Sequence, residues 1–99
     1  MAGIVEKTYA EAVFGLGKEQ NCLETLCTEI FETAEILGEN PDFIKLLSSP
    51  TISFDEKKES LNKVFSGKLS EYAMNFLFVI TEKNRMSSFM GISECLKSL

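Results

Sequence analysis

The sequence predicts an all-α fold, a six-helix antiparallel bundle that forms one domain. Apolar residues recur every three or four positions in successive stretches, which is the spacing of one face of a helix. Asn-Pro, Ser-Pro and Ser-Gly pairs separate these stretches by short connections, as is typical of neighbouring antiparallel helices. The chain has 99 residues, of which 44% are hydrophobic, so it is long enough to bury a core of its own.

The first helix is expected over residues 4–16. Five apolar residues fall on one of its faces: Val5, Tyr9, Ala12, Val13 and Leu16. Ala10 and Phe14 form an adjacent strip, so the apolar surface is wider than one packing contact requires. Gly15 and Gly17 each weaken a helix by about 1 kcal/mol relative to Ala, and we expect them to end it.

The second helix is expected over residues 20–37, with Gly38 as its stop. Its apolar residues keep helical spacing over four turns: Leu23, Leu26, Cys27, Ile30, Ala34 and Leu37. Its acidic residues are expected on the solvated side: Glu24, Glu29, Glu32 and Glu35. This pattern is that of a helix with one face on the core.

Two shorter helices follow, over residues 41–47 and 54–65. Asn40-Pro41 starts the first, because Pro is favoured at the first helical position, and Ser49-Pro50 ends it. Ser53 and Glu56 have the spacing of a capping box at the start of the second. The residues expected to point inward are Phe43, Ile44, Leu47, Phe54, Leu61, Val64 and Phe65.

The fifth helix, expected over residues 69–85 with Ser70 as its cap, is the most apolar part of the chain. One face can dock on a core: Ala73, Phe76, Leu77 and Ile80. Two further strips flank it, one of Tyr72, Asn75 and Val79 and the other of Met74 and Phe78. A helix this apolar is either central to a bundle or has one flank that lines a groove for a partner helix. Periodicity does not choose between the two flanks.

The last helix is expected to begin near Met86. Phe89, Ile92 and Leu96 keep helical spacing, and Gly91 is a weak point. No Gly, Pro or polar tail marks a stop before Leu99. We therefore expect that a second domain follows in the whole protein.

Composition excludes several kinds of chemistry. The chain has no His, so neither a Ser-His-Asp nor a Cys-His arrangement can form. Residues 15–18 (GLGK) lack the full spacing of a phosphate-binding loop. Cys22, Cys27 and Cys95 fit no zinc pattern, and we expect them to be free thiols. No catalytic residue, metal or cofactor is therefore expected.

The charge of the chain bears on its partners. A net charge of −5 argues against nucleic acid and against an anionic membrane surface. The longest apolar run has five residues, whereas a membrane span needs about 20, so no direct membrane insertion is expected. The first seven residues match neither a secretory nor a transit signal, so a reducing compartment is the default.

The chain resembles the N-terminal domain of the delta subunit of bacterial F-type ATP synthase and is similar to the mitochondrial oligomycin-sensitivity-conferring protein. Three motifs carry the resemblance, in the same order and spacing as in that family. The first is YAEAVF at residues 9–14, and the second is SPTI at 49–52 with Glu56-Lys57, Leu61 and Phe65. The third is NFL at residues 75–77 with Ile80, EKNR at 82–85, Phe89 and Ile92.

The resemblance implies a six-helix bundle that sits on the catalytic head and holds the N-terminal helix of an alpha subunit in an apolar groove between helices one and five. It also implies which residues line that groove: Val5, Tyr9, Ala12, Tyr72, Asn75 and Val79. It thereby favours the Tyr72 flank of helix five over the Met74 flank. The alternative that Tyr9 and Val79 pack in the core stays open.

The function implied is that of a non-catalytic stator component, which links the catalytic head to the peripheral stalk. Residues 1–99 would be the N-terminal helical domain, and the C-terminal domain, absent here, would meet a peripheral-stalk subunit. The protein would lie on the cytoplasmic side of the bacterial inner membrane as part of the complex, soluble when isolated. The alternatives are a helical adaptor of another complex and a thiol-based regulatory domain.

Overall fold

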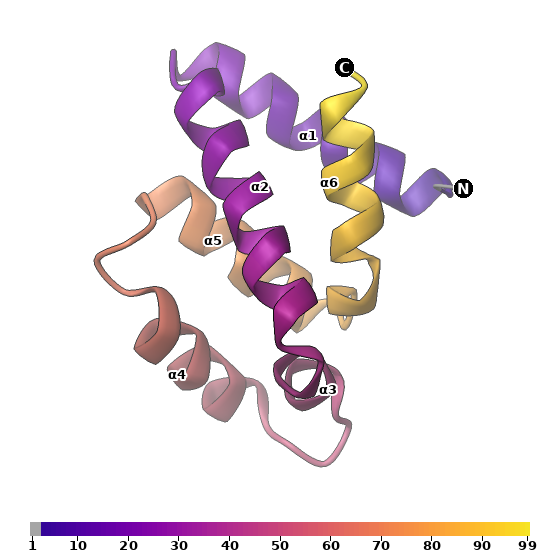
Figure 1. The fold of residues 1–99 in the computed structure, drawn as a ribbon, viewed down its shortest axis with the longest axis vertical. Coiled ribbons are helices and arrows are strands. Elements are labelled where there is room, and N and C mark those ends of the chain that lie inside the picture. Colours follow the sequence, from indigo (N-terminus) through magenta and orange to yellow (C-terminus); the bar gives the residue numbers. More distant parts are fainter. Residues whose placement is uncertain (1–2) are drawn as a thin grey trace.

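The computed structural model describes residues 3–99, and the regular structure in that range is entirely helical (Figure 1). This confirms the predicted all-α class and six-helix bundle. The elements in chain order are α1 (Ile4–Glu19), α2 (Leu23–Glu39), α3 (Pro41–Ser48), α4 (Phe54–Phe65), α5 (Glu71–Glu82), the 3₁₀ helix η1 (Met86–Ser88) and α6 (Phe89–Lys97).

Helix α2 runs from the top of the view down to α3 and passes in front of α1 and α5 (Figure 1). Both α1 and α5 pack on α2 and cross behind it in this view. Helix α6 packs on α1 and α2, α4 packs on α5, and α3 packs on α2 and η1. Because α1 and α5 contact the same helix at different heights, they can border a space between them.

The core draws on every α-helix. Its buried apolar residues are Ala10, Val13, Leu26, Ile30, Leu37, Leu47, Leu61, Phe65, Ala73, Leu77, Ile80, Met86, Phe89, Ile92 and Leu96. On α5, the predicted core face is correct for Ala73, Leu77 and Ile80, whereas Phe76 is half-buried. On α4, Val64 was expected inward but is 37% exposed. Leu61 and Phe65 complete the buried face of that helix, so Val64 falls outside it.

Helix α1 continues to Glu19, so the expectation that Gly15 and Gly17 end it was wrong. Gly17 is buried, and a Cβ atom at this position would lie 2.8 Å from Cα of Leu23. The glycine therefore allows the end of α1 to approach the start of α2 closely. Tertiary packing of this kind outweighs a low intrinsic helix propensity.

Helix α2 begins at Leu23, three residues later than expected, because a turn intervenes in which Asn21 has φ 55°. Glu29 was expected in solvent, but it is 9% exposed and faces the start of α5. There its carboxylate accepts hydrogen bonds from the backbone N–H and, at 2.7 Å, from the hydroxyl of Ser70. Each carboxylate oxygen of Glu29 thus accepts one hydrogen bond from Ser70, which joins α2 to the start of α5.

The N-terminal caps of α4 and α5 are the two serines expected from the sequence, Ser53 and Ser70. The Ser53 hydroxyl accepts a hydrogen bond from the N–H of Glu56 at 3.2 Å, and the Ser70 hydroxyl accepts one from the N–H of Ala73 at 3.3 Å. Each side chain satisfies a donor that the first turn of a helix leaves free. Helix α5 ends at Glu82, and Asn84 with φ 59° lies in the turn that follows.

The last expected helix is divided into η1 and α6. A Cβ atom at Gly91 would lie 2.8 Å from Cγ of Glu6, so this glycine allows α6 to lie close against α1. Across residues 3–99, no helix has both the length and the hydropathy needed to cross a membrane.

Candidate functional site

An apolar groove of about 310 Å³ lies between α1 and α5. We call it the α1–α5 groove. Its lining residues are Tyr9, Ala12, Val13, Leu16, Leu26, Tyr72, Asn75, Phe76 and Val79. Eight of these nine side chains come from the two helices that the sequence marks as unusually apolar.

Helical periodicity builds both walls. On α1, the lining residues occupy positions 9, 12, 13 and 16, and on α5 they occupy 72, 75, 76 and 79. Each set has the three- and four-residue spacing that aligns side chains along one helix face. Leu26 of α2 is 1% exposed and forms the floor where both walls rest on that helix. The groove is therefore an open furrow above the core.

Aromatic contacts tie the walls to the core. The rings of Tyr9 and Phe76 meet edge to face across the groove, with centroids 6.3 Å apart. Phe76 also contacts the buried Phe89 of α6, at 6.1 Å between centroids. Such arrangements are favourable for aromatic quadrupoles, so the base of the groove is preformed.

A polar contact lies at one end of the groove. The hydroxyl of Tyr72 donates a hydrogen bond to Oε1 of Gln20 at 3.1 Å. Gln20 directly follows α1, and Tyr72 lies in the first turn of α5, so the end of one wall meets the start of the other. The two walls therefore run antiparallel.

The structure brings together five of the six residues that the family resemblance implies. Four of them are exposed lining residues: Ala12, Asn75, Tyr72 (39% exposed) and Val79 (43% exposed). The fifth, Tyr9, also lines the groove and is half-buried. Val5 does not line the groove, although it precedes Tyr9 by one turn on the same strip. Val79 is thus not a core residue, whereas Tyr9 packs partly against the core.

The two flanks of α5 differ clearly. Met74 and Phe78 are half-buried against the core, and Nζ of Lys58 lies 5.1 Å from the centre of the Phe78 ring. The Tyr72 flank, in contrast, is the open one. Helix α4 packs on α5 and occupies the position in which a partner on the Met74 flank would have to lie.

Four lining residues fell outside the predicted set. Val13 and Leu16 share the apolar face of α1 with Tyr9, so the periodicity of the sequence contained a signal for both. Phe76 was assigned to the docking face of α5, next to the strip that lines the groove. Leu26 lies on a third helix, and only the tertiary arrangement brings it to the groove floor.

The cysteines form no obvious reactive centre. Cys22, Cys27 and Cys95 are free thiols of intermediate burial, as expected. Burial raises the pKa of the Cys27 thiol, which reduces its thiolate fraction and hence its reactivity at neutral pH. Within residues 3–99, no group of His, Cys, Asp and Glu side chains is arranged to hold a metal ion.

The fold and groove together define a small helical module with one open apolar groove between α1 and α5. The family model described as ATP synthase delta (OSCP) subunit matches residues 5–99. The chain therefore belongs to the ATP synthase delta (OSCP) subunit family.

Individual relatives agree with this assignment. The chain is 38% identical over 99 residues to ATP synthase subunit delta of Alkaliphilus metalliredigens and 35% identical over 100 residues to that of Clostridioides difficile. It is 34% identical over 94 residues to a delta subunit from Ilyobacter tartaricus described as sodium ion specific. These alignments cover 94–100% of this chain but 53–55% of the relatives, so the chain spans about half their length.

Proposed function

We propose that this chain is a non-catalytic stator component of an F-type ATP synthase and corresponds to the N-terminal helical domain of the delta subunit. Membership of the family over residues 5–99 supports the proposal. A rotary enzyme needs a static frame that resists torque on its catalytic head. A small bundle with a continuous core suits a rigid joint in that frame.

In this proposal the α1–α5 groove holds the N-terminal helix of an alpha subunit. The observation that carries the proposal is the groove itself, which is almost wholly apolar, preformed and bordered by two helices. An amphipathic helix can lay its apolar face in such a groove, and burial gains about 25 cal/mol for each Å² of apolar surface removed from water.

Two wider features belong to the same proposal. A further domain, of the kind that the longer relatives have room for, would contact a peripheral-stalk subunit and so connect the head to the stalk. The assembled protein would lie at the cytoplasmic side of a bacterial inner membrane, held there by the complex.

The test is titration of the 99-residue chain with a synthetic peptide that has the sequence of the alpha-subunit N-terminal helix from the same organism. The substitution Val79→Asp places a carboxylate where the peptide would pack, and charges are costly to bury without a partner. We expect the dissociation constant to rise about tenfold or more, equivalent to at least about 1.4 kcal/mol.

Val64→Asp is the matched control, because Val64 has a similar exposure, 37%, but lies on α4 outside the groove. It should leave peptide affinity unchanged, and circular dichroism should show both variants folded. Peptide binding that is insensitive to Val79→Asp would place the partner elsewhere. No binding by the parent chain would favour a helical adaptor of another complex.

A further inference from the structure

Carboxylates border one end of the α1–α5 groove. Glu19 lies three residues beyond Leu16 on α1, and Glu71 lies four residues before Asn75 on α5. Residues at these spacings are neighbours on a helix surface, so each carboxylate stands beside a lining residue. Both glutamates are exposed, and each is adjacent in sequence to a partner in the Tyr72–Gln20 hydrogen bond. They therefore lie at the same end of the groove, which we call the acidic end.

The nearby cation on α1 does not neutralise this end. Nζ of Lys18 lies 5.5 Å from the centre of the Phe14 ring, and Phe14 is not a lining residue of the groove. On the helix, Phe14 points well away from Tyr9 and Leu16. The ammonium of Lys18 is thus held over a different face of α1.

The opposite end of the groove carries both signs of charge. Glu82 follows Val79 by three residues and Lys83 follows it by four, so both lie near that end, and both are exposed. The ion pairs found within residues 3–99, Glu59–Lys63 and Glu94–Lys97, involve none of these groups. The groove is therefore electrically asymmetric along its length.

We propose that the groove selects an amphipathic helix that carries Lys or Arg beside its apolar stripe at the end that meets Glu19 and Glu71. This inference rests on the proposed function and specifies the chemistry of the partner and the place of its basic residues along the groove. The apolar stripe supplies most of the affinity, while opposite charges at the edge of an interface speed association and fix register.

The experiment compares two synthetic amphipathic helices that share one apolar stripe. One carries Lys and the other Glu at the flanking positions of one end, and both are titrated calorimetrically into the 99-residue chain. At about 50 mM NaCl we expect the Lys peptide to bind about tenfold more tightly, and at about 500 mM we expect the difference to shrink to about twofold. Equal affinities at low salt would overturn the charge proposal and leave the groove proposal intact. If neither peptide binds, the charge proposal fails, and the titration with the alpha-subunit peptide decides the groove proposal separately.

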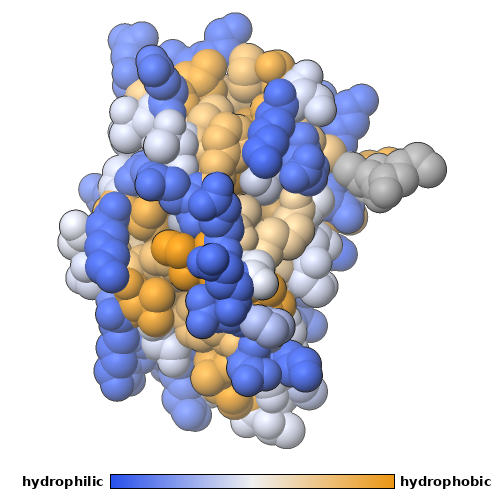
Figure 2. Space-filling model, viewed as in Figure 1, coloured by the Kyte–Doolittle hydropathy of each residue, from blue (hydrophilic) through white to orange (hydrophobic). Residues whose placement is uncertain are grey.

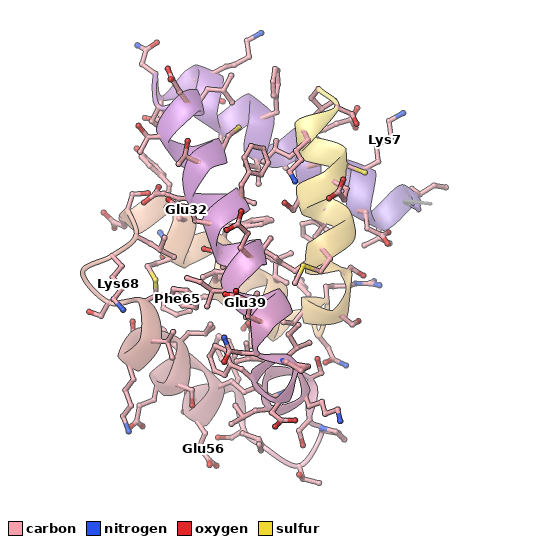
Figure 3. The ribbon with its side chains drawn as sticks, in the orientation of Figure 1. Lys7, Glu32, Glu39, Glu56, Phe65 and Lys68 are labelled. Carbon is pink, nitrogen blue, oxygen red and sulfur yellow. The ribbon has the colours of Figure 1, made fainter. Side chains whose placement is uncertain are left out.

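A pair of variants locates the effect. Glu19→Lys should raise the dissociation constant of the Lys peptide about three- to tenfold. An exposed ion pair contributes modestly to affinity, and reversing one of its charges adds repulsion. Glu39→Lys is the control: Glu39 is also exposed and also the last residue of its helix, and Figure 3 shows it at the far end of α2 from α1. That helix has 17 residues and so spans about 25 Å. Equal effects of the two variants would overturn the assignment to the acidic end.

Discussion

At the scale of single residues, the two glycines of α1 sit in opposite environments. A Cβ atom at Gly17 would lie 2.8 Å from backbone Cα of Leu23, whereas one at Gly15 would have nothing within 4 Å. Helix propensity favours Ala over Gly at both positions. The space around each glycine therefore decides whether its substitution by Ala stabilises or destabilises the fold.

We expect Gly17→Ala to lower the free energy of unfolding by about 1–3 kcal/mol, because a backbone atom must move to relieve the overlap. Gly15→Ala should raise it by about 0.5–1 kcal/mol, as Ala is the better helix former. Urea denaturation followed by circular dichroism measures both. Two stabilising substitutions would mean that the approach of α1 to α2 is looser than the structure shows.

At the scale of helices, we expect stability and partner binding to depend on different flanks of α5. Phe78 is half-buried beside α4, whereas Val79 is 43% exposed in the groove. Phe78→Ala should lower the free energy of unfolding by about 1–3 kcal/mol, less than for a fully buried Phe. The same variant should have a peptide dissociation constant within about twofold of that of the parent chain, since Phe78 does not line the groove. Denaturation and titration of the same variant test this, and a Phe78→Ala variant that binds as poorly as Val79→Asp would contradict it.

Much of this level of organisation could be predicted from the sequence. The strips on α1 and α5 follow from periodicity, and the caps at Ser53 and Ser70 follow from residue type. The end of α1 could not be predicted, because the propensity of Gly17 gives no hint of its contact with Leu23. Likewise, the burial of Glu29 could not be predicted, because it falls among the solvent-facing acidic residues of α2 and its partner Ser70 is 41 residues away. Both misses arise where a tertiary contact outweighs a local preference.

At the scale of the whole molecule, binding is expected to depend on packing and charge and not on thiol chemistry. On the face seen in Figure 2, hydrophilic side chains are interspersed among apolar patches. The helices that form the groove walls, α1 and α5, lie behind α2 in that orientation. A single groove of this kind would suit one partner at a time.

Replacement of Cys22, Cys27 and Cys95 together by Ser or Ala should leave peptide affinity within about twofold, because none of them lines the groove. The same titration in the presence and absence of a reductant should give equal dissociation constants for the parent chain. Loss of binding in the cysteine-free variant, with its circular dichroism unchanged, would favour the thiol-based alternative.

The hydrogen bonds from Ser70 to Glu29 have a consequence for how mutations in this protein should be interpreted. They anchor the first turn of α5 to the side of α2, and Tyr72 stands in that turn. Glu29 does not line the groove, yet its carboxylate helps to position Tyr72, which does. We expect a substitution of Glu29 to weaken partner binding in an affinity assay, although Glu29 itself does not line the groove.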